Sequence, residues 1–279
     1  QAEDGIRDFC LSRGLGDVYK RQGIHMPLAV CWKKKIPANQ TVSKLVGFID
    51  LTATIHHAFD IKNEGEHPIS GKSFLELLME NQKTTTLVHQ QKIFAGRERH
   101  SSSRYNTLGY PQRCIRTNQF LLVRNYKPER WPAGPGQKNK KGPNSELGPK
   151  HNGYHDIDAC PTLDYLIKGR SDSTISKYFH LAVSKRKYEQ LFNIIEDPYC
   201  INDLVGKPEY KEKHKELADQ LTNYLVQTKD PRENGNGDIF ETYPRYSSIR
   251  WFPTPNWAKD NPETIPPTPW LKTNLRIKK

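Results

Sequence analysis

Three short apolar runs, at residues 88–95, 113–117 and 120–126, constrain the fold of this chain more than any other feature. Turn-forming segments separate them. Apolar runs of this length, bounded by turn residues, are typical of β-strands. We therefore expect a small antiparallel sheet in the middle of the chain.

A long amphipathic helix is predicted over residues 208–229. The other positions of this segment carry mainly Lys and Glu, so a single face is apolar, as in a helix that covers a sheet. That face is formed by Tyr210, Leu217, Leu221, Tyr224 and Leu225.

The N-terminal third predicts a strand followed by two helices. Residues 24–32 form an apolar run that ends in three lysines, as a buried strand does where it reaches solvent. Residues 43–59 carry apolar side chains at helical spacing, and a second helix is expected over 73–80. Ser73 followed by Glu76 predicts a capping box at its start.

Three segments are set apart by their composition. Residues 1–22 end in DVYKRQ, which can be back-translated as the end of a transposase adaptor, so we interpret them as a non-native, adaptor-derived segment. Residues 132–153 are dominated by Pro, Gly, Asn and Lys and predict an exposed insertion. Residues 233–279 predict an irregular tail rich in Pro and Trp that lies across the body of the protein.

The chain of 279 residues carries a formal net charge of +12 and has no apolar run long enough to span a membrane. A basic surface attracts polyanions, which include nucleic acid, acidic lipid and sulfated polysaccharide, and charge alone does not choose among them. The cysteines after residue 22 lie far apart and form no zinc-site spacing. We expect buried thiols at Cys31, Cys114, Cys160 and Cys200.

One basic cluster is a candidate anion site. The sequence GRERH places Arg97, Arg99 and His100 at the end of an expected strand, where side chains often point into a site at a sheet edge. Guanidinium groups match the oxygens of sulfate, phosphate or carboxylate, and histidine adds a titratable donor. The alternative is a solvated strand end in which Glu98 pairs with an arginine of the cluster.

Other polar groups point to no chemistry. His56 and His57 are adjacent in an expected helix and therefore face different directions. Asp156 and Asp158 alternate as in a calcium loop, but no further oxygen ligands follow, which favours a turn. No Walker loop, GxSxG, HExxH or dinucleotide fingerprint occurs in the sequence.

Four segments in order resemble blocks of the type I sulfatases. Residues 23–55 resemble a strand followed by the DLxPT helix, with Ala53 in place of the usual proline. GKSFLELL at residues 71–78 is similar to the next block. Residues 94–134, from FAGRERH to RWPAG, resemble the heparan N-sulfatase and glycosaminoglycan sulfatase branch. Residues 188–206 resemble the block ELYDLxxDPxExxNLA, with Cys200, Asn202 and Asp203 at altered positions.

The resemblance implies an α/β fold of the alkaline-phosphatase-like type. In this reading residues 23–86 are the C-terminal end of the catalytic domain, with the terminal part of its central sheet. Residues 87–232 are the C-terminal subdomain, a small antiparallel sheet with a packed C-terminal helix. Arg97, Arg99 and His100 are expected to line the substrate side of the pocket, with no catalytic step assigned to them.

The catalytic centre of such sulfatases is missing from the sequence. Type I sulfatases use a formylglycine made in a C/S-x-P-x-R motif, together with a bound calcium, and that motif is absent. The resemblance implies that nucleophile and calcium ligands precede Gly23, so the chain is expected to be an inactive C-terminal fragment. A sulfated glycan or another small sulfated substrate is the expected partner, without nucleic acid or membrane. A periplasmic or secreted location is expected by resemblance.

Two other functions stay open at this point. The parent protein could be a phosphodiester or phosphonate hydrolase of the same superfamily, with an upstream Thr or Ser nucleophile. Alternatively, the chain could be a basic module without enzymatic activity that binds polyanions, which would fold alone and bind with strong salt dependence.

Overall fold

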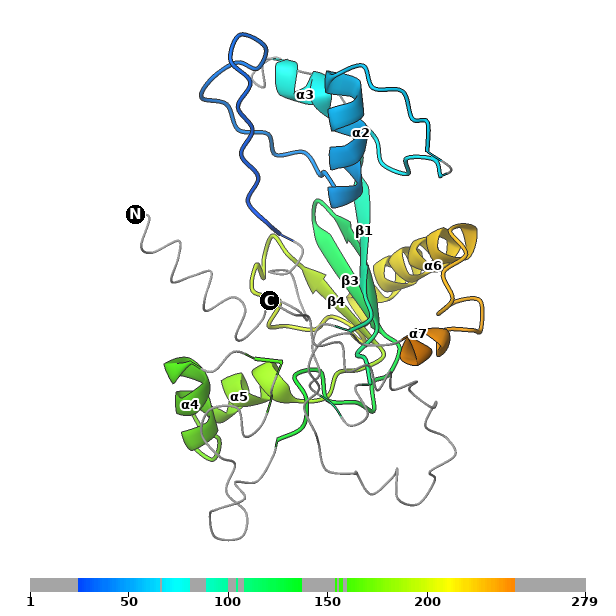
Figure 1. Ribbon diagram of the computed structural model, residues 1–279. Coiled ribbons are helices and arrows are strands. Elements are labelled where there is room, and N and C mark those ends of the chain that lie inside the picture. Colours follow the sequence, from blue (N-terminus) through cyan, green and yellow to red (C-terminus); the bar gives the residue numbers. More distant parts are fainter. Residues whose placement is uncertain are drawn as a thin grey trace, which may run out of the picture.

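The fold is a small antiparallel sheet with helices at both ends and along one face (Figure 1). The computed structural model describes residues 25–65, 67–80, 89–99, 104, 108–136, 154, 156–157 and 160–243. The elements, in chain order, are α2 (Phe48–Ala58), α3 (Leu75–Met79), β1 (Lys92–Arg97), β2 (Gln112–Thr117), β3 (Phe120–Asn125), α4 (Pro161–Lys168), α5 (Ser176–Val183), β4 (Glu189–Asn193), a 3-10 turn (Pro208–Tyr210), α6 (Lys211–Gln227) and α7 (Ile239–Thr242).

The sheet has the order β1-β2-β3-β4, and every neighbouring pair is antiparallel. In the register, Cys114 lies opposite Ala95 on one side and Val123 on the other. Side chains alternate between the two faces of a strand, so both faces of the central strands can be apolar. The predicted small antiparallel sheet is confirmed, and β4 is a strand that the sequence patterns did not indicate.

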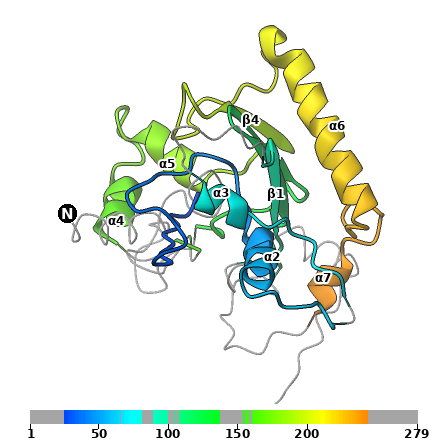
Figure 2. The same cartoon turned by 90° about the horizontal axis from the view of Figure 1, so that it is seen from above.

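Helix α6 covers one face of this sheet (Figure 2). Its apolar stripe packs on Ile115, Leu122 and Leu191, which are all fully buried. The helix residues of that stripe are Leu217, Leu221 and Leu225, three of the five positions named from the sequence. The opposite face buries Cys114, Leu121, Val123 and Phe192 against Cys200. The amphipathic helix expected at 208–229 is therefore confirmed.

Helices α4 and α5 form a separate cluster at one end of the sheet, while α2 and α3 lie at the other end (Figure 1). The α4–α5 cluster buries Leu163, Phe179 and Val183 together with Tyr110 and Ala133. No periodic pattern in the sequence had indicated these two helices. Residues 132–134 were expected to begin an exposed insertion, but they are buried.

Helix α2 forms where it was expected but turns its apolar side outward. Phe48 is 72% exposed and Phe59 is 69% exposed, whereas Asp50 and Thr54 are buried. The polar side is turned inward because it is hydrogen bonded: the hydroxyl of Thr54 accepts from the backbone N–H of Phe74 at 3.1 Å. The apolar spacing predicted the helix correctly and its buried face wrongly.

Three local predictions need correction. The strand expected at 24–32 is not formed over residues 25–32, which have no regular secondary structure and are largely exposed. The capping box at Ser73 is not formed, since the helix N-cap is Phe74, although Ser73 Oγ accepts from the N–H of Leu75. The tail expected to be irregular from residue 233 includes the short helix α7.

The cysteines are free thiols within the described residues, and Cys114 and Cys200 are buried as expected. Cys31 is exposed, which contradicts the expectation for that residue. Burial raises the pKa of the Cys114 thiol to about 11, so it stays protonated at neutral pH. Among the helices that the structure describes, none is both long and apolar enough to cross a bilayer.

Candidate functional site

The basic cluster begins at the last residue of β1, Arg97, and continues beyond the strand. Its side chains contact separate parts of the chain. Arg97 Nη2 lies 3.2 Å from Asp156 Oδ2. Arg99 Nη2 donates to the carbonyl oxygens of Phe240 and Tyr243, at 3.2 and 3.3 Å. His100, the third predicted residue, lies outside the described residues.

Glu98 belongs to a buried network rather than to a pair within the cluster. Its carboxylate accepts from Arg113 Nη2 at 2.6 Å and from Arg232 Nη2 at 2.7 Å. Arg113 also donates to Asp230 at 2.6 Å. Burial by itself would lower the pKa of Arg113, but its hydrogen bond to Asp230 and the charge of Glu98 outweigh burial and raise the pKa. The predicted pairing of Glu98 with a neighbouring arginine is therefore wrong.

Gly96 makes this network sterically possible. A Cβ built at this position would lie 2.7 Å from Arg113 Cδ, closer than side chains tolerate. Arg113 faces Gly96 directly across the β1–β2 pair, so its side chain crosses the strand at the glycine. The glycine of GRERH thus permits the close approach that ties the strand end to residues 230–232.

Asp156 is the shared counterion of two arginines. Its side chain is fully buried and receives Arg97 and also Arg104, whose Nη2 lies 3.1 Å from the same Oδ2. Arg104 in addition donates to the carbonyl oxygens of Trp131 and Pro132. The turn predicted around Asp156 is present, but the sequence did not indicate that this carboxylate would hold Arg97 in place.

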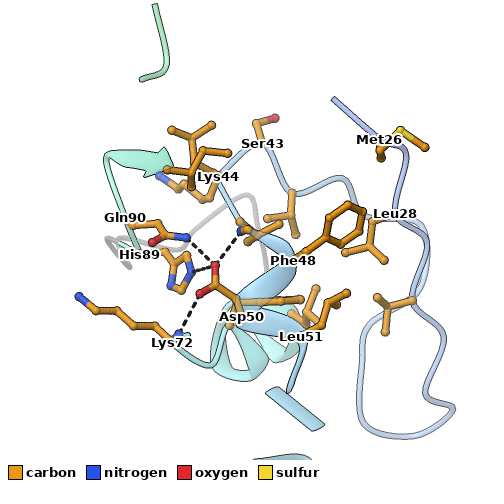
Figure 3. Close-up of a pocket in the computed structure, with 18 of the residues that line it drawn as sticks. Met26, Leu28, Ser43, Lys44, Phe48, Asp50, Leu51, Lys72, His89 and Gln90 are labelled. Atoms are coloured by element: carbon orange, nitrogen blue, oxygen red, sulfur yellow. Dashed lines mark hydrogen bonds and ion pairs between the residues drawn. The ribbon is translucent and has the colours of Figure 1, made fainter. Parts of the chain in front are cut away.

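A hollow of about 1790 Å³ lies between residues 25–51 and the start of β1 (Figure 3). Apolar side chains such as Met26, Leu28 and Phe48 face it. Asp50 is its buried charged group, and the carboxylate accepts from the N–H of Gly47 at 2.7 Å. This hollow is open and mainly apolar.

Further donors complete the surroundings of Asp50. It accepts from the N–H of Lys72 at 2.8 Å and from Gln90 Nε2 at 2.5 Å, and His89 Nε2 lies 3.8 Å away (Figure 3). A carboxylate whose oxygens are occupied by structural donors is poorly placed to act on a substrate. Asp50 therefore joins the start of α2, the segment before α3 and the start of β1.

No group of three or more His, Cys, Asp or Glu side chains placed to hold a metal occurs within the described ranges. The part of the chain that the structure describes therefore supplies no such cluster for calcium, and we assign no chemical step to a metal. That calcium binds to the longer parent protein remains a prediction.

Glu241 provides a pH-dependent link between α7 and the sheet. It is 3% exposed and accepts from Arg130 Nη1 at 2.6 Å and from the N–H of Gly109 at 3.1 Å. Burial would raise the pKa of Glu241, but the charge and hydrogen bond of Arg130 hold it below the ordinary value of 4.5. A depressed folded-state pKa contributes stability above the unfolded-state pKa, and this stability is lost as the pH falls.

We therefore expect E241Q to lower the free energy of unfolding at pH 7 by about 1–3 kcal/mol, because the charged partner of buried Arg130 is lost. The difference between wild type and variant should shrink as the pH falls below 4.5, the ordinary pKa of Glu241. Urea unfolding at several pH values measures both quantities. A difference that stays constant down to pH ~3 would contradict the linkage.

The comparisons with known proteins add one curated relative. No family model matches the sequence. The chain is 22% identical over 216 residues to an ulvan-active sulfatase of Formosa agariphila, a match that covers 75% of this chain. The chain spans 30% of the length of that relative.

Solved structures overlap with the chain in part. One is a protein in complex with its substrate D-glucosamine-2-N,6-O-disulfate, with 17% identity and a TM-score of 0.38, covering 66% of this chain and 25% of that protein. Another, from work on the metabolism of multiple glycosaminoglycans by Bacteroides thetaiotaomicron, has 15% identity and a TM-score of 0.40, covering 75% of this chain and 32% of that protein.

Proposed function

We propose that this chain is the C-terminal part of a sulfuric ester hydrolase that acts on sulfate esters or N-sulfates of a sulfated glycan. The observation that carries the proposal is the similarity over 216 residues to a curated sulfatase. The four sulfatase-like blocks, in their usual order, also support the proposal, and this support does not depend on the net charge of the chain. The formylglycine and its calcium belong to other parts of the parent protein, so the chain alone is inactive.

In this proposal the end of β1 is the substrate side of the site. Arg97 and Arg99 are each held by contacts from elsewhere in the chain. A guanidinium presents a planar set of donors that matches sulfate oxygens. Fixing both groups before the substrate arrives reduces the entropy lost on binding. Their role is to bind and orient the anionic substrate.

The proposal can be tested by determining the natural coding sequence upstream of residue 23. We expect a C/S-x-P-x-R motif there, and we expect the longer protein to release sulfate from a sulfated glycan. Replacing the Cys or Ser of that motif by Ala should abolish the release. An upstream Thr or Ser nucleophile in another sequence context, together with phosphodiester cleavage, would overturn the proposal.

The anion-binding role of Arg99 can be tested on the chain itself. R99A should weaken binding to heparin about tenfold, the loss expected for one charge-assisted hydrogen bond of about 1.4 kcal/mol. Isothermal titration at fixed ionic strength measures this change, because polyanion binding depends strongly on salt.

The matched control is K215A, which removes one positive charge from an exposed position on α6. If K215A weakens binding as much as R99A, the chain attracts heparin through its net charge, and the site assignment is wrong. R99K should recover only part of the affinity, since it restores the charge without the planar set of donors.

A further inference from the structure

Trp131 is an aromatic side chain that is fixed in position and yet exposed. Its exposed fraction is 38%, although the three residues that follow it are buried. Two of those residues are Pro132 and Ala133, and Ala133 is part of the α4–α5 core. The exposed part of the indole is an apolar surface that a ligand can contact.

The backbone around Trp131 is held from both sides. Arg104 Nε donates to the carbonyl oxygen of Trp131 at 2.8 Å, and the N–H of Gly134 donates to the same oxygen at 3.1 Å. On the preceding side, Arg130 Nη1 donates to the carbonyl oxygen of Gly109 and to Glu241. The ring thus projects from a rigid turn rather than from a flexible loop.

A cation lies over this ring. Lys185 Nζ is 5.5 Å from the centroid of the Trp131 ring, within the range of a cation–π interaction. Lys185 follows α5, whose last turn is closed by the hydrogen bond from the N–H of Ser184 to the carbonyl of His180 at 3.0 Å. The guanidinium of Arg186 donates to the carbonyl oxygens of Leu181 and Ala182. The chain on both sides of Lys185 is therefore anchored.

The same turn is connected to Arg97 at the end of β1. Arg104 binds both the carbonyl of Trp131 and the carboxylate of Asp156, and Asp156 also binds Arg97. These contacts tie the backbone of Trp131 to the guanidinium of Arg97.

We propose that Trp131 and Lys185 form a subsite for a second sugar unit of a sulfated glycan, next to the unit held by Arg97 and Arg99. This inference rests on the proposed function. The indole offers an apolar surface for the C–H face of a sugar ring, and the ammonium of Lys185, 5.5 Å from the ring centroid, binds a sulfate group of that unit. The subsite thus recognises a chain of at least two units, where the end of β1 alone recognises one.

The test compares ligands of two lengths. A heparin-derived hexasaccharide and a sulfated glucosamine monosaccharide are titrated against the 279-residue chain and its variants. W131A and K185A should each weaken hexasaccharide binding about tenfold, which corresponds to about 1.4 kcal/mol. Monosaccharide binding should change by less than about twofold, because a single unit is held without the subsite. W131F should retain most of the affinity.

The matched control is Y199A, which removes a more exposed aromatic ring, 76% exposed, from the segment after β4. Equal losses for Y199A and W131A would overturn the subsite, and so would wild-type affinity in both W131A and K185A. A wild-type chain that binds neither ligand overturns it as well. None of these results decides the proposed hydrolase activity, which depends on sulfate release by the longer protein.

Discussion

Replacing Asp156 by alanine is expected to lower the free energy of unfolding by about 3–5 kcal/mol, the largest effect of any single change considered. The carboxylate is fully buried and is shared by Arg97 and Arg104, whose side chains are 17% and 5% exposed. Removing it leaves two guanidinium groups close together without their common counterion. Each then loses a partner that water cannot fully replace.

The measurement is urea unfolding, followed by circular dichroism, of D156A and of D156N. The asparagine variant keeps the shape and one acceptor but not the charge, so its loss should be smaller. D219A is the matched control, because Asp219 is 59% exposed and pairs with exposed Lys215 on α6. That control should change stability by less than about 1 kcal/mol. A D156A variant as stable as D219A would show that the arginines do not depend on Asp156.

Replacing Asp50 by alanine is expected to cost about 3–4 kcal/mol, with the loss confined to the end of the molecule that carries α2 and α3. The carboxylate of Asp50 is 1% exposed and accepts three hydrogen bonds, from Gly47, Lys72 and Gln90. Without it, these partly buried donors lose their acceptor. Helix α2 is held mainly by such polar contacts, since its apolar stripe faces outward.

Hydrogen exchange distinguishes a local loss from a global one. In D50A the amides of α2 and α3 should exchange faster, while those of β2, β3 and α6 keep their protection, because local units of a fold can open separately. E64A, at an exposed position in the same part of the chain, is the control and should leave exchange unchanged. Equal loss of protection in α6 and α2 would contradict the local role of Asp50.

The elements that were predicted correctly are those whose apolar pattern lies within one contiguous segment of the sequence. The strands β1 to β3 are short apolar runs between turns, and α6 repeats leucine at helical spacing. Such patterns report which face of one segment is apolar, and they do so without knowledge of its neighbours. The strand β4 and the helices α4 and α5 carry weaker patterns and take their positions from packing.

The strand expected at residues 24–32 shows the limit of that reasoning. An apolar run becomes a strand only when another strand offers its backbone N–H and C=O groups. Within the described residues no strand pairs with this run. Helix α2 shows the same limit, since its apolar spacing was real but the hydrogen bonds of Asp50 and Thr54 determined which side faces inward.

The sequence by itself determined the small antiparallel sheet, its covering helix and the position of a basic cluster at the end of β1. Only the tertiary structure decided which partners that cluster contacts. Glu98 contacts Arg232, 134 positions away, and Arg97 contacts Asp156, 59 positions away. Charge pairing across such separations has no periodic signature, because it depends on where packing brings segments together and removes water from between them.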